Sequence, residues 1–347
     1  MKKIAILLLL ALTVSLFAGC MGTPVVVSNC TCPTGSHENV ENTVPAEGAV
    51  KTGLAVITTL KGADATAGGE GKVEYDVTLV AVTVDDNGVI TGCVIDSLGT
   101  SVSFDENGTI TTDLTAAIQT KNELGENYVM KAAGYAYEWN EQAAALAAYA
   151  VGKTVEELKN GVVDGFASDV DLATTASIYL GGYVSGIEVA VNNAQHLGAQ
   201  AGDELRLASI SSLSSSAGAA ADKAGNAQLN CDVTAITMNG DKITSCVIDS
   251  VQAKAAFDAS GVITSDLSVA PQTKNQLGEA YGMKAAGSAY EWNEQAANFA
   301  AYVTGKTVAD VAGIAVNEKT APTDADLASS VTIAIDGFQA LIDKAAQ

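Results

Sequence analysis

Glutamates at a fixed spacing are the first residues in this sequence that could do chemistry. Glu138, Glu141 and Gln142 recur as Glu291, Glu294 and Gln295 in a second, nearly identical segment. Paired carboxylates can act as general acid and base. Glutamates on the solvated face of an amphipathic helix need no such role. The helical spacing favours the solvated face, so we assign no catalytic residue and expect a carrier or binding module rather than a catalyst.

A second candidate combines acidic and hydroxyl side chains. Residues 169–183 read DVDLATTASIYLGGY, and residues 324–338 read DADLASSVTIAIDGF. Each stretch begins acid, spacer, acid, leucine and continues with small residues and hydroxyls. One interpretation is structural, because Ser and Thr hydroxyls readily cap a turn that leads into a strand.

Metal and nucleophile chemistry have little support. The only histidines, His37 and His196, lie in non-equivalent places, which argues against a zinc or Ser-His-Asp site in each half. Cys30 and Cys32 form a C-x-C pair that is either a metal or redox pair or part of a flexible tether. We favour the tether and predict no metal site.

The N-terminus predicts export and a membrane anchor. The segment MKKIAILLLLALTVSLFAGC has a basic start, an apolar stretch and small residues before Cys20, which is the pattern of a signal peptide over 1–19. A cysteine after Ala-Gly also fits a lipobox, so we expect diacylation of Cys20 and location on the extracytoplasmic face of the cell membrane. The alternative is an ordinary signal peptide followed by a chance cysteine.

The net charge of the chain restricts the classes of partner that it can bind. The net charge is −22, which repels nucleic-acid phosphates and anionic headgroups, so we exclude nucleic acid as a partner. Excess negative charge also keeps a surface protein soluble, and this is the simpler interpretation.

The chain contains two copies of one unit. Residues 119–154 return almost unchanged as 272–307. A repeat of this length is domain-sized rather than a solenoid repeat. We therefore predict a tether over 20–50 and two domains over 51–199 and 200–347, each long enough to bury a core.

Each copy predicts an α+β fold, a twisted, mainly antiparallel sheet packed by helices. The long shared stretch reads as a helix with Trp139 or Trp292 on its apolar face, ended by Gly152 or Gly305. Strands are expected over 54–60 and 207–213, over 73–84 and 89–96 in the first hairpin, around 106–108 and 259–261, and after each acidic-hydroxyl stretch, which then leads into a closing helix.

The acidic-hydroxyl stretches resemble the flavin-attachment motif D-x-x-[S/T]-G-A-T of the FMN-binding domain family. The surroundings are also similar, with hairpins NGVITGCVID and GDKITSCVID and the later segments YAVGKTVEEL and YVTGKTVADV. Members include the C subunit of the sodium-pumping NADH:quinone reductase and the Rnf G subunit. The matching positions are Asp171, Thr174, Thr175 and Ser177 in the first copy, and Asp326, Ser329, Ser330 and Thr332 in the second.

The resemblance implies an electron carrier with a redox partner of unspecified identity. In the family the last threonine carries FMN through a phosphoester, so Thr332 is the better attachment candidate and Ser177 the poorer one. Non-covalent FMN is the variant of this interpretation. The alternative from a different class is a cofactor-free surface lipoprotein that acts as a solute-binding or interaction module.

The copies depart from the motif at one position above all. Thr175 and Ser330 replace the glycine, and such residues resist positive φ if the turn requires it. Val331 replaces the alanine and, being β-branched, is expected to crowd the attachment position.

Overall fold

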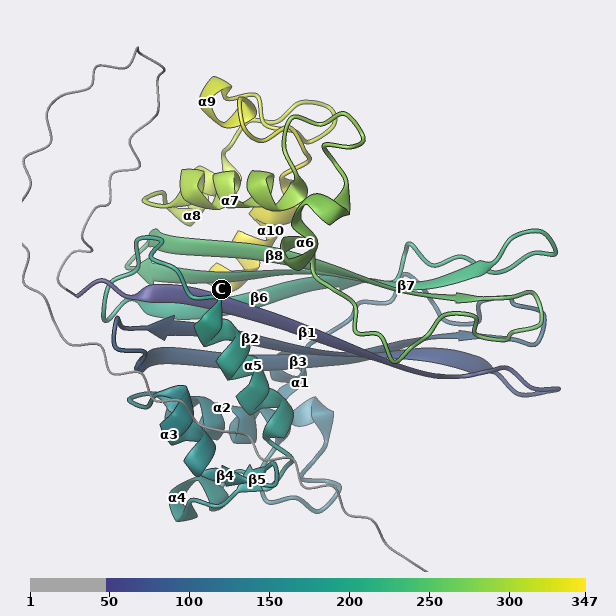
Figure 1. Ribbon diagram of the computed structural model, residues 1–347, viewed down its shortest axis with the longest axis horizontal. Helices are drawn as coiled ribbons and strands as arrows, with labels where there is room; N and C mark the ends of the chain where they lie inside the picture. Colours follow the sequence, from purple (N-terminus) through teal and green to yellow (C-terminus); the bar gives the residue numbers. More distant parts are fainter. Residues whose placement is uncertain (1–47) are drawn as a thin grey trace, which may run out of the picture. The chain divides into compact units, whose positions relative to one another are not determined.

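The computed structural model describes residues 48–347, which belong to one compact unit (Figure 1). The predicted signal peptide, the Cys20 lipid anchor, the Cys30–Cys32 pair and most of the tether lie outside the described residues. Within residues 48–347, no helix is both long and apolar enough to cross a bilayer.

Each repeat contributes one three-stranded antiparallel sheet, in the order β1-β2-β3 and β6-β7-β8. The strands are β1 Lys51–Ala63, β2 Gly71–Val84, β3 Ile90–Phe104, β6 Glu204–Ser212, β7 Gly225–Asn239 and β8 Lys242–Phe257. A separate short hairpin in the first repeat joins β4 Val162–Val163 to β5 Phe166–Ala167. The predicted α+β class with antiparallel sheets is confirmed.

The helices follow their sheet in the same order in both repeats. In the first repeat they are α1 Lys121–Leu124, η1 Gly125–Tyr128, α2 Trp139–Ala150, α3 Val155–Asn160, α4 Val170–Ala173 and α5 Gly181–Asn192. In the second they are α6 Lys274–Leu277, η2 Gly278–Tyr281, α7 Trp292–Val303, α8 Val308–Ala312, α9 Ala325–Ala328 and α10 Asp336–Ala346.

The central strand β2 shows why the sheets are covered on both faces. Alternate side chains of a strand point to opposite faces, and in β2 both sets are buried. Val73, Tyr75 and Val77 face one core, whereas Val80 and Val82 face another. A strand buried on both faces must lie between two layers.

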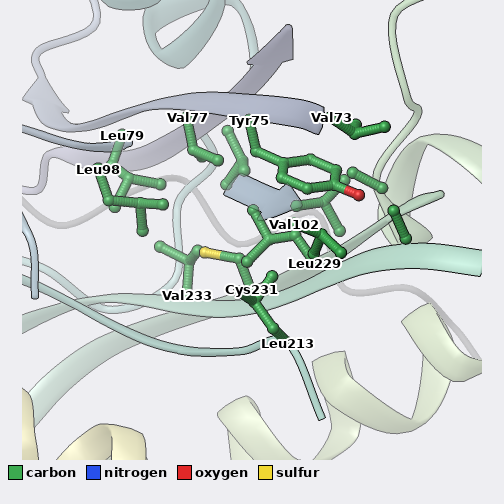
Figure 2. Close-up of a cluster of buried hydrophobic side chains, with 14 of the residues drawn as sticks. Val73, Tyr75, Val77, Leu79, Leu98, Val102, Leu213, Leu229, Cys231 and Val233 are labelled. Atoms are coloured by element: carbon green, nitrogen blue, oxygen red, sulfur yellow. The ribbon is translucent and has the colours of Figure 1, made fainter. Parts of the chain in front are cut away.

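The described residues form four layers, helices–sheet–sheet–helices (Figure 1). One core lies between the first sheet and helices α2 and α5. Another lies between the second sheet and helices α7 and α10. The third lies between the two sheets, where side chains of β2 and β3 meet those of β7 (Figure 2). The two copies therefore share a core in addition to the one that each holds under its helices.

Each copy makes the same backbone contact with the other copy. Ala65 N donates to Gly261 O, and Ala219 N donates to Gly108 O, both at 2.8 Å. Such reciprocal contacts are those of an isologous interface, in which residue i of one unit meets j of the other and j meets i. The repeats thus pack like the subunits of a symmetric dimer. The boundary between residues 199 and 200 stays a prediction.

Several sequence predictions can be compared with the structure directly. The helices with the tryptophans end before Gly152 and Gly305, which adopt φ of 83° and 84°. Trp139 and Trp292 are buried, as predicted for core residues. The two predicted short strands are instead turns at the end of β3 and β8, each closed by one isolated bridge. The predicted strand after each acidic-hydroxyl stretch is also absent from the described residues, because a turn leads directly into α5 or α10.

Candidate functional site

Each acidic-hydroxyl stretch forms a one-turn helix followed by a turn. Asp169 and Asp324 are the N-caps of α4 and α9, and each carboxylate accepts the backbone N–H groups two and three residues later. A carboxylate at this position satisfies donors that the helix itself cannot. The first acid of each stretch therefore has a structural role, and the second, Asp171 or Asp326, is exposed in the first turn.

Hydroxyls end these short helices. Thr174 Oγ1 donates to Asp171 O, and Ser329 Oγ donates to Asp326 O, both at 2.7 Å. These two hydroxyls are bound to their own helix and leave the last hydroxyl of each stretch, Ser177 or Thr332, as the candidate for attachment.

A buried glutamine holds the turn that carries Thr332. Gln295 is fully buried, and its Oε1 accepts from Thr332 N at 2.8 Å, Thr332 Oγ1 at 3.1 Å and Ile333 N at 3.2 Å. Its Nε2 donates to Tyr290 O at 3.1 Å. Because one side chain satisfies three donors, the turn is fixed to helix α7.

The first copy repeats this arrangement. Gln142 Oε1 accepts from Ser177 N at 2.8 Å, Ser177 Oγ at 3.2 Å and Ile178 N at 3.1 Å. Gln142 is also fully buried. The sequence placed both glutamines beside the glutamates on a solvated helix face, and only the fold shows that they point to the hydroxyl turn.

The turns that carry the substituted motif positions have ordinary backbone conformations. Among the described non-glycine residues, positive φ occurs at Val129, Asp164 and Thr320, so Thr175 and Ser330 occupy their turns without the conformation that favours glycine. Val331 is fully buried in the core under the helices. It therefore anchors the turn from inside, whereas the neighbouring Thr332 is exposed. Crowding of an attached group by Val331 stays a prediction.

The fold brings the aromatic-Gly-Lys segment to the acidic stretch. Tyr149 Oη donates to Asp169 Oδ2 at 3.1 Å, and the Lys153 ammonium lies 3.9 Å from the Tyr149 ring centroid. Burial and the nearby Asp169 carboxylate raise the pKa of Tyr149. The two segments that carry the family resemblance are thus in contact.

The second copy adds a surface pocket at the same place. A pocket of about 500 Å³ is lined by Tyr302, Lys306 and Asp324, among others. The Lys306 ammonium lies 4.2 Å from the Tyr302 ring centroid. An aromatic ring, a cation and the cap of α9 therefore border one hollow next to the stretch that carries Thr332.

The first copy instead exposes an aromatic pair. The Phe166 and Tyr179 rings meet edge to face at 5.6 Å, with 51% and 60% of their surfaces exposed. Tyr179 follows Ser177 by two residues. The sequence did not single out this pair, because exposure of an aromatic side chain depends on which elements cover it.

The helix glutamates are not on a solvated face throughout, which corrects the sequence interpretation. Glu138 and Glu291 are buried and cap α2 and α7. The Glu291 carboxylate accepts from Met283 N at 2.8 Å and Lys284 N at 3.0 Å. With its lone pairs given to backbone donors, this carboxylate has a structural role, which agrees with the absence of a catalytic assignment.

A lysine and a cysteine that recur at equivalent positions of the two copies also have packing roles. The Lys274 ammonium lies 4.5 Å from the Trp292 ring centroid, and burial lowers its pKa. Burial raises the pKa of the Cys246 thiol to about 12, which disfavours the reactive thiolate form. In the described part of the chain, no group of three or more His, Cys, Asp and Glu side chains could hold a metal ion.

Comparison with known proteins adds no assignment. No protein-family model, curated protein or solved structure matches this chain. The resemblance to FMN-binding domains therefore depends on the residues given above and stays a hypothesis.

Proposed function

We propose that this protein is an extracytoplasmic lipoprotein, anchored through Cys20, that carries FMN covalently on Thr332 and, as the second site, on Ser177. The observation that supports it most is the exposed Thr332 hydroxyl on a turn whose backbone is fixed by the buried Gln295. A bulky group attached there would project into solvent and leave the core undisturbed.

The residues present fit a covalent flavin better than a dissociable one. The stretch over 324–338 contains no Lys or Arg, and a phosphate held without a covalent bond normally needs such donors. Lys306 lies over Tyr302 and borders a hollow whose lining includes Asp324 but not Thr332. We therefore expect attachment through a phosphoester.

The chain itself does not activate the hydroxyl. Thr332 Oγ1 donates its proton to the amide oxygen of Gln295, and an amide oxygen accepts a hydrogen bond but is no general base. A separate transferase must therefore supply the base. FMN, once attached, supplies the electron transfer, while the protein positions it and sets its surroundings.

The intact mass and visible spectrum of the protein from its native host test this proposal. We expect a yellow protein whose mass exceeds that of the lipidated polypeptide by one or two FMN groups, each less one water. Thr332→Ala should remove one group, and Ser177→Ala should remove the second. Ser268→Ala is the matched control, because its exposed hydroxyl donates to Asp266 outside the motif and should leave the mass increment unchanged.

The same measurement distinguishes the alternative, a cofactor-free binding or interaction module. A colourless protein that lacks the FMN increment, prepared from a host that contains the transferase, would reject flavin attachment and leave this alternative. An increment that persists in Thr332→Ala, Ser177→Ala protein would place the cofactor elsewhere and overturn both assigned sites.

A further inference from the structure

One edge of the sandwich holds a large cavity. It has a volume of about 820 Å³ and lies where β1 and β8 meet, between the end of α5 and helix α7. Thr52 Oγ1 of β1 and Ser245 Oγ of β8 are 2.7 Å apart at this edge. Both repeats therefore build the cavity, and neither would contain it alone.

The opposite edge of the sandwich shows what fills the equivalent space. There the Lys344 ammonium of α10 forms an ion pair with Glu123 of α1 and donates to Ser209 O of β6 at 2.7 Å. The ammonium thus bridges a carboxylate and a carbonyl at a strand edge. An ammonium has only donors, and both of its partners have only acceptors.

The cavity lacks this bridge because the sequence differs at two equivalent positions. Alignment of the closing helices places Val189 of α5 opposite Lys344, and alignment of the repeats places Gln276 opposite Glu123. Val56 of β1 corresponds to Ser209. The duplication therefore gives two similar clefts, one closed by an ion pair and one open.

A group that bridges the open cleft, as Lys344 bridges the closed one, must both donate and accept hydrogen bonds. Gln276 Oε1 accepts from Thr273 N at 2.9 Å, as Glu123 Oε2 does from Thr120 N. Because the Thr273 N–H needs an acceptor, Gln276 uses its Oε1 there and presents its Nε2 group to the open cleft. At the equivalent position of the closed cleft, Glu123 presents a carboxylate oxygen. The bridging group must now accept from Gln276 and still donate to Val56 O.

Strand β1 shows which chemistry its free edge binds. Thr52 N donates to Gln195 O at 2.8 Å, and Gln195 N donates to Thr52 O at 3.1 Å. In an antiparallel ladder, residues two apart point their N–H and C=O groups to the same edge. Leu54 and Val56 therefore face the same way, and Leu54 O already accepts from Asn193 Nδ2 at 3.0 Å.

The lining is polar, and its single imidazole among the described residues, that of His196, lies with Nε2 2.9 Å from Asp86 Oδ1. Its polar side chains are largely amides: Asn192, Asn193, Gln195, Asn275, Gln276 and Asn293. Of the described residues that line it, none is Lys or Arg. The Asp249 carboxylate at this edge is buried and accepts from Ser250 N at 2.7 Å and Asn275 N at 3.1 Å. The cleft thus offers an anionic ligand no Lys or Arg, and the Oδ1 atom of its carboxylate already accepts two backbone donors.

We infer that this cleft binds a short, uncharged peptide in extended conformation, which pairs with the free edge of β1 at Val56 and accepts from Gln276. Addition of a strand to an exposed sheet edge is a general mode of peptide recognition. The amide side chains around the edge supply further donors and acceptors for peptide groups. Apolar side chains such as Val189 and Ile248 contact the remainder of the ligand.

Titration calorimetry with the full-length protein tests this inference, with acetyl-Ser-Ala-Ser-Ala-amide as the probe. We expect saturable binding at one site per chain. Val189→Lys with Gln276→Glu rebuilds the closing ion pair and should weaken binding by at least ~10-fold. Ser185→Lys is the matched control, because it adds the same charge to an exposed position of α5 outside the lining.

The closed cleft provides the reciprocal test. Lys344→Val with Glu123→Gln should open a second site, so that the chain binds about two peptides. Circular dichroism and melting temperature verify that each variant folds. Thr332→Ala should bind as the wild type does, because the inference does not depend on flavin attachment.

Three results would overturn the inference. They are no uptake of the peptide by the wild type, unchanged affinity in the Val189→Lys, Gln276→Glu variant, and binding of cellobiose in preference to the peptide. The last would assign the cleft to an uncharged polyol instead. Equal binding of the same peptide with a free carboxylate would refute the argument from charge.

Discussion

Phe104 and Phe257 stack face to face between the sheets, with ring centroids 4.1 Å apart and an interplanar angle of 4°. They are equivalent residues, at the end of β3 and of β8, and both are fully buried. A residue that contacts its own equivalent lies on the axis that relates the two copies. This stack therefore marks the centre of the interface that makes one unit of the two repeats.

Removal of either ring should lower the free energy of unfolding. We expect Phe104→Ala to lower the free energy of unfolding by about 3–5 kcal/mol, because a buried aromatic side chain leaves a cavity that the sheets fill only in part. Phe257→Ala should cost as much, and the double variant should cost less than the sum, since the two rings contact each other. Urea denaturation measures all three. Phe166→Ala, at an exposed position, is the control with a change within about 0.5 kcal/mol.

A single repeat should not persist as a monomer. Expressed alone, residues 200–347 would expose the face of β7 and β8 that the first sheet covers, including Leu229, Cys231 and Val233. Large exposed apolar surfaces drive association, and the reciprocal geometry offers a second copy as the substitute partner. Analytical ultracentrifugation should show dimers. A stable monomer with a cooperative melt would contradict this prediction.

Gln295 should matter for stability as well as for attachment. Gln295→Ala leaves Thr332 N and Ile333 N without their acceptor, and each unsatisfied buried donor costs about 1–3 kcal/mol. Because Thr332 is exposed and water can reach part of the turn, we expect a loss near the lower end of this range. Thermal denaturation measures the loss, and faster amide exchange at Ile333 would locate it. Thr332→Ala, which keeps both backbone bonds, is the control.

Glu291, the N-cap of α7, and Glu294 in its first turn should contribute unequally to stability. Glu291 is buried and accepts hydrogen bonds from two backbone N–H groups, so Glu291→Ala should lower the free energy of unfolding by about 1–3 kcal/mol. Glu294 forms an ion pair with Lys284 at 2.7 Å with both side chains well exposed, so removal of its ion pair should cost less than about 1 kcal/mol. Glu294 also accepts from Glu291 N, and Glu294→Gln keeps that bond while it removes the charge. Equal losses in Glu291→Ala and Glu294→Gln would contradict the assigned roles.

Stability should depend on pH through Asp249. Burial raises the pKa of Asp249 above the ordinary value of 3.8, although hydrogen bonds from Thr273, Asn275 and Ser250 oppose the shift. The folded state then holds a proton that the unfolded state has released, so this group's contribution to stability is full below pH 3.8 and falls as the pH rises through the folded pKa.

The variant Asp249→Asn isolates this contribution. In this variant the free energy of unfolding should decrease less as the pH rises above 3.8. Below that pH, its dependence on pH should arise from the exposed carboxylates. Urea denaturation across the acidic range measures both profiles. Asp258→Asn is the control, because hydrogen bonds from Ser260 and Val262 lower the pKa of Asp258, and its effect on the profile should have the opposite sign. A parallel shift of the whole Asp249→Asn profile would contradict the prediction.

The duplication, the α+β class and several local features could be predicted from the sequence. The two long helices carry Trp139 and Trp292 on their apolar faces and end before Gly152 and Gly305, as predicted. These features are local, since periodicity, caps and positive φ depend on residues within a few positions of one another.

Tertiary structure alone decided which faces are covered and what each polar group meets. Gln142 and Gln295 read as solvated residues, yet they are buried and hold the hydroxyl turns, because segments more than thirty residues later fold over them. The shared core, and the difference between the cleft closed by Lys344 and the open one beside Val189, arise from packing one copy against the other. Contacts of this kind join residues far apart in the chain, so the periodicity of either copy cannot reveal them.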